Sequence, residues 1–166
     1  MTNKTSVNKN TDSKQEQRAT KKAINEPDKK EVKTTFKTLY KGHAKKLSPK
    51  AEGHITFQLI EDDKGVKYLQ LLENTSGGVF SKLPVPLQLI LSTLEKQQQD
   101  KPFKSSIVKD VFTGKGSKSA NNTSFMIAVL RAEDIELLIS SENSQFLSKL
   151  SPNFKAKAKQ LLAKKV

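Results

Sequence analysis

The chain has 166 residues, of which 34% are hydrophobic and 28% are charged, a composition that fits one domain with flexible ends. It has no cysteine, which excludes disulfides and thiolate metal sites, and no apolar run of about 18 residues or signal-peptide core, so we expect a cytoplasmic protein without a membrane span. The net charge of +13 is uneven. It divides into +9 for residues 1–50, −2 for residues 51–142 and +6 for residues 143–166.

Residues 1–33 are rich in Lys, Asn, Thr, Ser and Gln and contain almost no apolar side chains. Such a segment cannot bury enough surface to offset the entropy lost on ordering, so we expect a disordered basic tail. The character of the chain changes near residue 34, where the folded part is expected to begin.

The first strand is expected at residues 35–40, where Phe36 and Tyr40 fall on one face by simple alternation. With lysines between and after them, this strand could stack bases on its rings while the lysines hold phosphates. Aromatic rings facing a core and lysines facing water explain the same pattern without a ligand. The candidate binding residues of this region are Lys37, Tyr40, Lys41, Lys45 and Lys46.

Three further strands and a helix are expected next. Residues 55–60 alternate between apolar and polar, which indicates a half-buried strand, and residues 66–72 follow a glycine turn as its antiparallel partner. Residues 79–83 resume extended character before two prolines. The helix is expected at residues 87–97, because apolar residues recur there at helical spacing.

Two interpretations fit the following part of the chain. In the first, residues 105–112 and 123–130 are strands of a second hairpin, and residues 132–141 form a helix. In the second, both segments are helices and a strand follows, as in a winged helix-turn-helix. Periodicity does not decide, since the second segment is apolar on every side, but the long Gly/Ser/Lys linker slightly favours the hairpin.

That linker, residues 113–122, holds a candidate phosphate contact. Two glycines allow close backbone approach and two lysines supply charge, although a flexible exposed connection explains the same residues. In the winged-helix interpretation, two asparagines at its end start the recognition helix. The candidate binding residues here are Lys115, Lys118, Asn121 and Asn122.

A basic helix is expected at residues 153–164, where an apolar stripe is surrounded by lysines. Such a helix could bind nucleic acid, an anionic membrane or a protein partner, and it could equally dock on the domain by its stripe. The candidate binding residues of this helix are Lys155, Lys157 and Lys159.

These elements predict an α+β fold with a small antiparallel sheet, and a β-hairpin followed by a winged helix-turn-helix is the alternative. We expect three parts: the disordered tail at residues 1–33, a single domain at residues 34–142 and a basic helical extension at residues 143–166. The order of strands and first helix resembles the layout of PUR-type single-strand binders.

The sequence offers no catalytic constellation. His43 and His54 are the only histidines, and neither cysteine nor a paired carboxylate cluster accompanies them, so we expect no metal site, no cofactor and no enzyme.

The uneven charge favours a small, bacterial-type protein that binds DNA or RNA through its basic ends. Single-stranded nucleic acid is included in this expectation. A DNA-binding transcriptional regulator with a winged helix is one alternative. A protein-interaction or adaptor module that docks an acidic protein partner is the other. The oligomeric state is left open.

Overall fold

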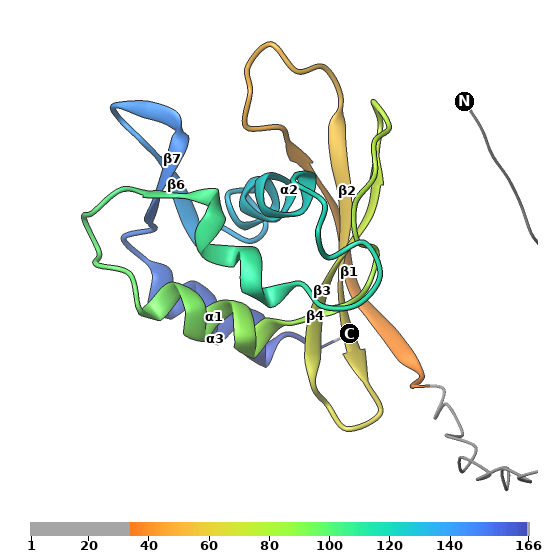
Figure 1. Ribbon diagram of the computed structural model, residues 1–166. Coiled ribbons are helices and arrows are strands. Elements are labelled where there is room, and N and C mark those ends of the chain that lie inside the picture. The colour runs from red at the N-terminus through yellow and green to blue at the C-terminus, as the bar shows by residue number, and fades with distance from the viewer. Residues whose placement is uncertain (1–33, 166) are drawn as a thin grey trace, which may run out of the picture. The chain divides into compact units, whose positions relative to one another are not determined.

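The structure is a computed structural model and describes residues 34–165; the tail expected at residues 1–33 lies outside the described residues. The alternating segments near its start form a four-stranded antiparallel sheet, here called sheet A, in the order β1-β2-β3-β4 (Figure 1). The strands expected near 35–40, 55–60 and 66–72 are confirmed and are each longer. The strands of sheet A are β1 (Phe36–Lys45), β2 (His54–Asp62), β3 (Lys67–Asn74) and β4 (Val85–Pro86).

The rest of the described chain contains four helical segments, the loops between elements and a second, three-stranded sheet, here called sheet B, in the order β5-β7-β6. Both sheets are antiparallel, which confirms the α+β class. The helices are α1 (Leu87–Glu95), the 3₁₀ helix η1 (Ser105–Val111), α2 (Asn121–Leu130) and α3 (Phe154–Ala163). The strands of sheet B are β5 (Phe103–Lys104), β6 (Leu138–Ser141) and β7 (Ser144–Leu150).

The hairpin expected from residues 105–112 and 123–130 is wrong, because these segments form η1 and α2. The helix expected at residues 132–141 is also wrong, because a turn there leads into β6. The second interpretation is confirmed in that both segments are helical and a strand follows them. The linker at residues 112–120 is nevertheless longer than the three or four residues, roughly, of a helix-turn-helix.

A β-bulge decides which residues of β1 face the core. The register against β2 shifts between Thr38 and Tyr40, which leaves Leu39 as the extra residue. Phe36 therefore lies on the outer side of sheet A, whereas the Tyr40 ring turns inward, 6.1 Å from the ring of the fully buried Phe57. The interpretation that Phe36 and Tyr40 share one face is wrong, because it assumed unbroken alternation.

The strand expected at residues 79–83 is also wrong. Side chains of α2, and not a neighbouring strand, take its backbone groups: the Asn121 amide donates to the Val79 carbonyl (3.0 Å), and the Ser81 N–H donates to Asn122 Oδ1 (2.7 Å). Between β3 and α1, only the two residues of β4 pair with β3. The segment is thus held as an extended loop by polar side chains.

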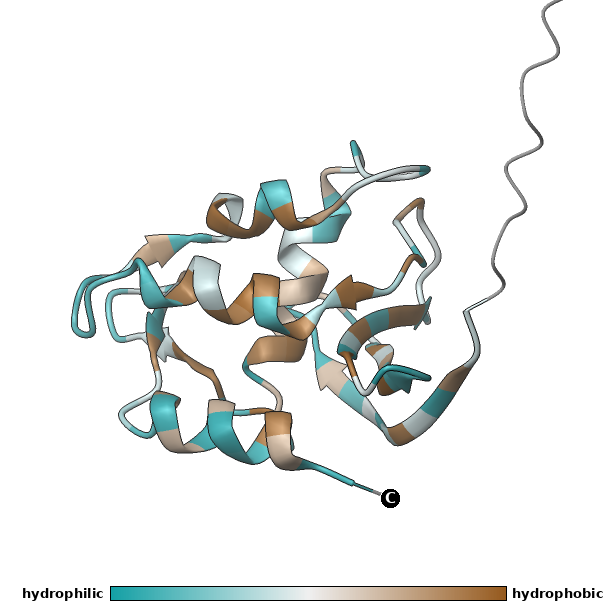
Figure 2. Cartoon of the chain, turned by 90° about the horizontal axis from the view of Figure 1, so that it is seen from below, coloured by the Kyte–Doolittle hydropathy of each residue, from teal (hydrophilic) through white to brown (hydrophobic). Residues whose placement is uncertain are grey.

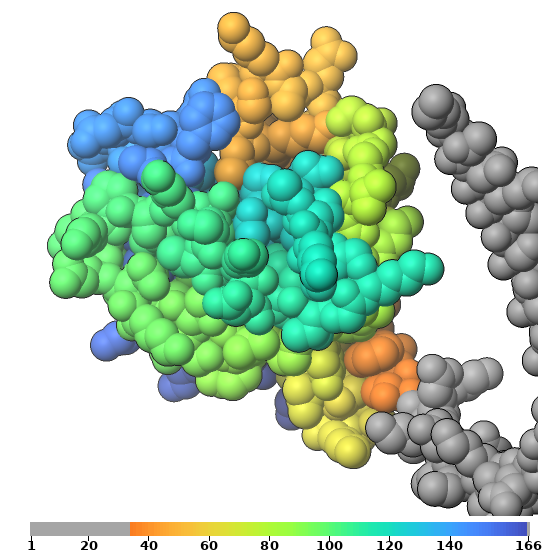
Figure 3. All heavy atoms as spheres, in the orientation of Figure 1, coloured from red at the N-terminus to blue at the C-terminus, as the bar shows by residue number. Residues whose placement is uncertain are grey.

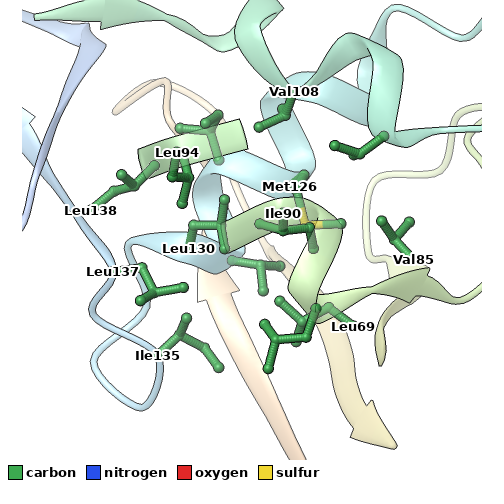
Figure 4. Close-up of a cluster of buried hydrophobic side chains, with 14 of the residues drawn as sticks. Leu69, Val85, Ile90, Leu94, Val108, Met126, Leu130, Ile135, Leu137 and Leu138 are labelled. Carbon is green, nitrogen blue, oxygen red and sulfur yellow. The ribbon is translucent and has the colours of Figure 1, made fainter. Parts of the chain in front are cut away.

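The hydrophobic core lies between sheet A and the helices. Figure 4 shows Leu69 from β3, Ile90 from α1 and Met126 from α2 converging with other apolar side chains, and none of these three is more than 1% exposed. Along the strands of sheet A, hydrophobic and hydrophilic residues alternate (Figure 2), as expected of a sheet with one buried face. The core therefore fixes the opposite face of sheet A as its polar side.

The C-terminal elements pack with the rest of the described residues. β7 pairs with both β5 and β6, so the boundary expected at residues 142/143 falls inside the β6–β7 hairpin. The helix expected at residues 153–164 is confirmed as α3, which buries Phe154, Ala158 and Leu161 of its stripe. Within residues 34–165, no helix is long and apolar enough to cross a membrane.

Candidate nucleic-acid interface

The side of sheet A opposite the helices, here called the outer face, is uncovered by any other described helix or strand (Figure 1). Alternation along β2 predicts polar residues on this side, and the structure confirms it for Thr56 and Gln58. The side chains of the outer face are Phe36, Thr38, Lys41, His43 and Lys45 on β1, His54, Thr56, Gln58, Ile60 and Asp62 on β2, and Tyr68, Gln70 and Glu73 on β3.

An aromatic pair occupies one end of the outer face. The rings of Phe36 and Tyr68 meet edge to face, with centroids 5.4 Å apart, and flank Ile60, which is only 1% exposed. The Phe36 ring remains 39% exposed. Since the Tyr68 hydroxyl donates to Asp62 Oδ2 at 3.0 Å, it is the rings that this end offers to a ligand.

A row of hydrogen-bonded amides crosses the middle of the outer face. Gln58 Nε2 donates to Gln70 Oε1 at 2.7 Å, and Gln70 Nε2 donates to the Lys82 carbonyl at 2.6 Å. Thr38 Oγ1 donates to Gln58 Oε1 at 3.4 Å. Each glutamine uses one of its two N–H groups in this row, so the second N–H of each can donate to a bound molecule.

The other end of the outer face is cationic and carries both histidines. Their rings meet edge to face with centroids 4.5 Å apart, and Thr56 Oγ1 lies 3.2 Å from His43 Nδ1. Lys41 and Lys45 flank His43 on β1, and both are exposed. Lys41 and Lys45 outweigh Glu73, which lies opposite Thr56 on β3, so this end of the sheet attracts anions.

Tyr40 lies away from the outer face. Its ring carries the Lys164 ammonium 4.4 Å from the ring centroid, which joins the end of α3 to β1. A hydrogen bond to the Asp134 carboxylate, together with burial, raises the pKa of Tyr40 to about 12. This tyrosine therefore holds elements together and does not offer its ring to a base.

We expect both tyrosines to titrate above their ordinary pKa of 10.0, because burial and the nearby Asp62 raise the pKa of Tyr68 as well. A tyrosine pKa raised by folding stabilises the protein below pH 10, and this contribution is lost as the pH rises from 10 toward 12. Tyrosinate absorbance should show the late titration. In Tyr40→Phe, the loss of stability across this pH window should be smaller, and an equal loss would contradict the role of Tyr40.

The other residues predicted for binding on β1 and in the linker lie elsewhere. Lys37 pairs across the strands with Glu61 on the inner side, and Lys46 donates to the Glu52 carbonyl (2.7 Å) and to the Ser76 hydroxyl. The predicted residues of the linker and its end divide into two exposed lysines, Lys115 and Lys118, and two asparagines with structural bonds, Asn121 and Asn122.

The lysines predicted on α3 do not join the outer face either. Lys155 and Lys159 are exposed, whereas Lys157 forms an ion pair with Glu136 at 2.5 Å. Of the twelve residues predicted for binding, the structure therefore brings Lys41 and Lys45 together on the outer face.

The sequence analysis did not predict that the histidine pair, the two glutamines and the Phe36–Tyr68 pair lie on one surface. Alternation places each on the polar side of its own strand, so a signal existed. What was missing is the register of β1, β2 and β3, which brings side chains from different strands together. That register depends on bulges after Thr38 and after Thr56.

Within residues 34–165, no group of three or more His, Cys, Asp or Glu side chains is placed to hold a metal ion. In comparisons with known proteins, no family model, curated protein or solved structure matches the chain.

Proposed function

We propose that this chain is a non-enzymatic protein that binds single-stranded nucleic acid on the outer face of sheet A. The supporting observation is the composition of that face: exposed lysines at one end, an aromatic pair at the other and a fixed row of amides between them. Lysines would hold phosphates, the rings would stack on bases, and the amides would donate to base edges.

A single strand suits this face better than a duplex. Base stacking on aromatic side chains requires bases that are free of their own stack, and an open sheet presents its rings without entering a groove. A duplex reader needs a protruding helix or ribbon that fits the major groove.

The order of η1, α2 and the β6–β7 hairpin favours a second candidate, a DNA reader of the winged-helix type. That function requires the start of α2 to face the DNA. Asn122 is 0% exposed, and Asn121 is bonded to the Val79 carbonyl, so the first turn of α2 is already occupied. For this reason the outer face is the better-supported site.

We expect the double substitution Lys41→Ala/Lys45→Ala to weaken binding of a single-stranded oligonucleotide about tenfold at low salt. Losing two phosphate contacts should also reduce the slope of log K against log salt by about 1.4. Fluorescence anisotropy of the full chain against single- and double-stranded DNA and RNA at several salt concentrations measures both effects.

The matched control is Lys96→Ala/Lys101→Ala, which removes the same charge from exposed lysines beyond α1. Equal effects of the two double variants would assign the binding to overall charge and overturn the proposed face. Binding that ignores salt, or no binding at micromolar protein, would overturn the nucleic-acid function itself. A salt-sensitive complex with a cellular protein that survives nuclease treatment would favour the acidic-partner alternative.

A further inference from the structure

A cleft lies above α2, between the loop that follows β1 and strand β7. It consists of two adjoining cavities of about 450 Å³ and 300 Å³, which share Lys46, Leu47 and Ala128 as lining residues. In Figure 3, the β1–β2 loop (orange) and the β6–β7 hairpin (blue) stand next to each other above α2, and they form the two walls. The combined space falls within the range of about 300–1,000 Å³ that is typical of small-molecule sites.

The smaller cavity is mainly apolar and has an aromatic ring on either side. Phe125 of α2 is held in place by the ring of Phe80, with centroids 5.6 Å apart. Phe146 of β7 lines the cavity and is 55% exposed, so its ring is accessible to a ligand. Ser105 and Ser124 also line this cavity, and the Ser124 hydroxyl donates to the Asn121 carbonyl at 3.0 Å. Aromatic rings and a few hydroxyls suit a flat, partly polar ring.

The outer face leads to this cleft. Lys45 and His43 belong to the outer face and also line the larger cavity, so a strand that follows β1 past Lys45 reaches the cleft directly. The charge next to the smaller cavity is net cationic, because Lys46 lines it and Lys50 and Lys104 adjoin lining residues, against Glu52, which adjoins Ala51. A polyanionic strand fits this approach.

The acids of the cleft lie in its larger part. Glu133 and Asp134 line the cavity of about 450 Å³, and Asp134 lies beside Tyr40, whose pKa it raises. The smaller cavity has no acidic lining residue. A base belonging to an anionic strand is therefore accommodated in the smaller cavity, away from these carboxylates.

We infer that the smaller cavity receives one nucleobase of the strand bound on the outer face. The base stacks against Phe146, and its polar edge faces the hydroxyls of Ser105 and Ser124. This inference rests on the proposed function and adds to it a specific subsite, which makes binding depend on one unstacked base and not on backbone charge alone.

The test uses the full chain and three single-stranded oligonucleotides, with the fluorescent base aminopurine at the 5′ end, in the middle or at the 3′ end. One labelled position should change its fluorescence strongly on binding. Phe146→Ala should remove that change and weaken the complex about tenfold. Ala51 lies in an exposed loop and lines the same cavity, so Ala51→Trp should fill the space and likewise remove the fluorescence change and weaken the complex. Leu89→Ala truncates a similarly exposed apolar residue on α1 and is the control.

The outcomes separate this inference from the proposed function. If the oligonucleotides bind with the expected salt dependence but Phe146→Ala and Ala51→Trp behave like Leu89→Ala, the subsite is overturned and the function stands. The cleft would then belong to another ligand class, such as an apolar side chain of a partner protein. If no oligonucleotide binds, the proposed function fails as well.

Discussion

Replacing Asn122 by alanine is expected to lower the free energy of unfolding by about 3 kcal/mol. The Asn122 side chain is fully buried and serves three backbone groups: it accepts from the Ser81 N–H (2.7 Å) and donates to the carbonyls of Gly116 (2.7 Å) and Ser117 (3.1 Å). Alanine leaves the Ser81 N–H and the Ser117 carbonyl without these partners, whereas the Gly116 carbonyl still accepts from the Ser119 N–H at 3.2 Å. Each buried, unsatisfied group costs about 1–3 kcal/mol. Denaturant unfolding monitored by circular dichroism measures the difference.

The neighbouring Asn121 provides the matched control. Its amide is partly exposed and makes one bond, to the Val79 carbonyl, so Asn121→Ala should cost about 1 kcal/mol. If both variants lose the same small amount, Asn122 does not hold the extended loop and the linker together. A stable Asn122→Ala protein that has lost a preference for a specific duplex site would instead favour the winged-helix function.

Replacing Arg131 by alanine is expected to cost about 2 kcal/mol of stability. Its guanidinium donates to the carbonyls of Gln145 (2.7 Å) and Leu147 (2.6 Å) and, through two nitrogens, to the Ser148 hydroxyl. This fork ties the end of α2 to β7, the far wall of the cleft. Burial lowers the pKa of Arg131, yet a guanidinium stays charged at neutral pH, so the loss includes charge-assisted hydrogen bonds.

Arg131→Lys separates charge from geometry, because lysine keeps the charge but lacks the planar fork. We expect it to recover less than half of the stability lost in Arg131→Ala. Full recovery in a thermal melt would show that charge alone holds β7. The proposed cleft adds a second readout, since a loosened wall should reduce oligonucleotide binding even in a variant that remains folded.

The first half of the fold could be predicted because its strands are half-buried. The alternation of apolar Ile55 and polar Thr56 predicts which side faces the core, and α1, expected at residues 87–97 and observed at Leu87–Glu95, shows one apolar face for the same reason. The prediction of which side chains share a face failed at the bulge in β1. No residue type between Phe36 and Tyr40 requires one, so the change of face became visible only once the register with β2 was known.

The second half could not be predicted from periodicity because α2 has no polar face. It lies in the core against η1 and sheet A, and the five residues from Met126 to Leu130 are all buried, so its apolar run fits a helix and a strand equally well. The basic ends were misleading in another way. The lysines of β1 and α3 belong to folded elements, so this part of the charge at the two ends of the sequence lies on the surface of the domain.

The bulge in β1 also matters for reading related sequences. In residues 36–38 the even-numbered side chains lie on the outer face, whereas in residues 40–45 the odd-numbered ones do. The single extra residue, Leu39, makes this change compatible with one continuous strand. A relative lacking one residue in this short stretch would align perfectly from Tyr40 onward and yet show different side chains at the aromatic end of its sheet. Insertions and deletions here therefore carry more information about a shared ligand than substitutions do.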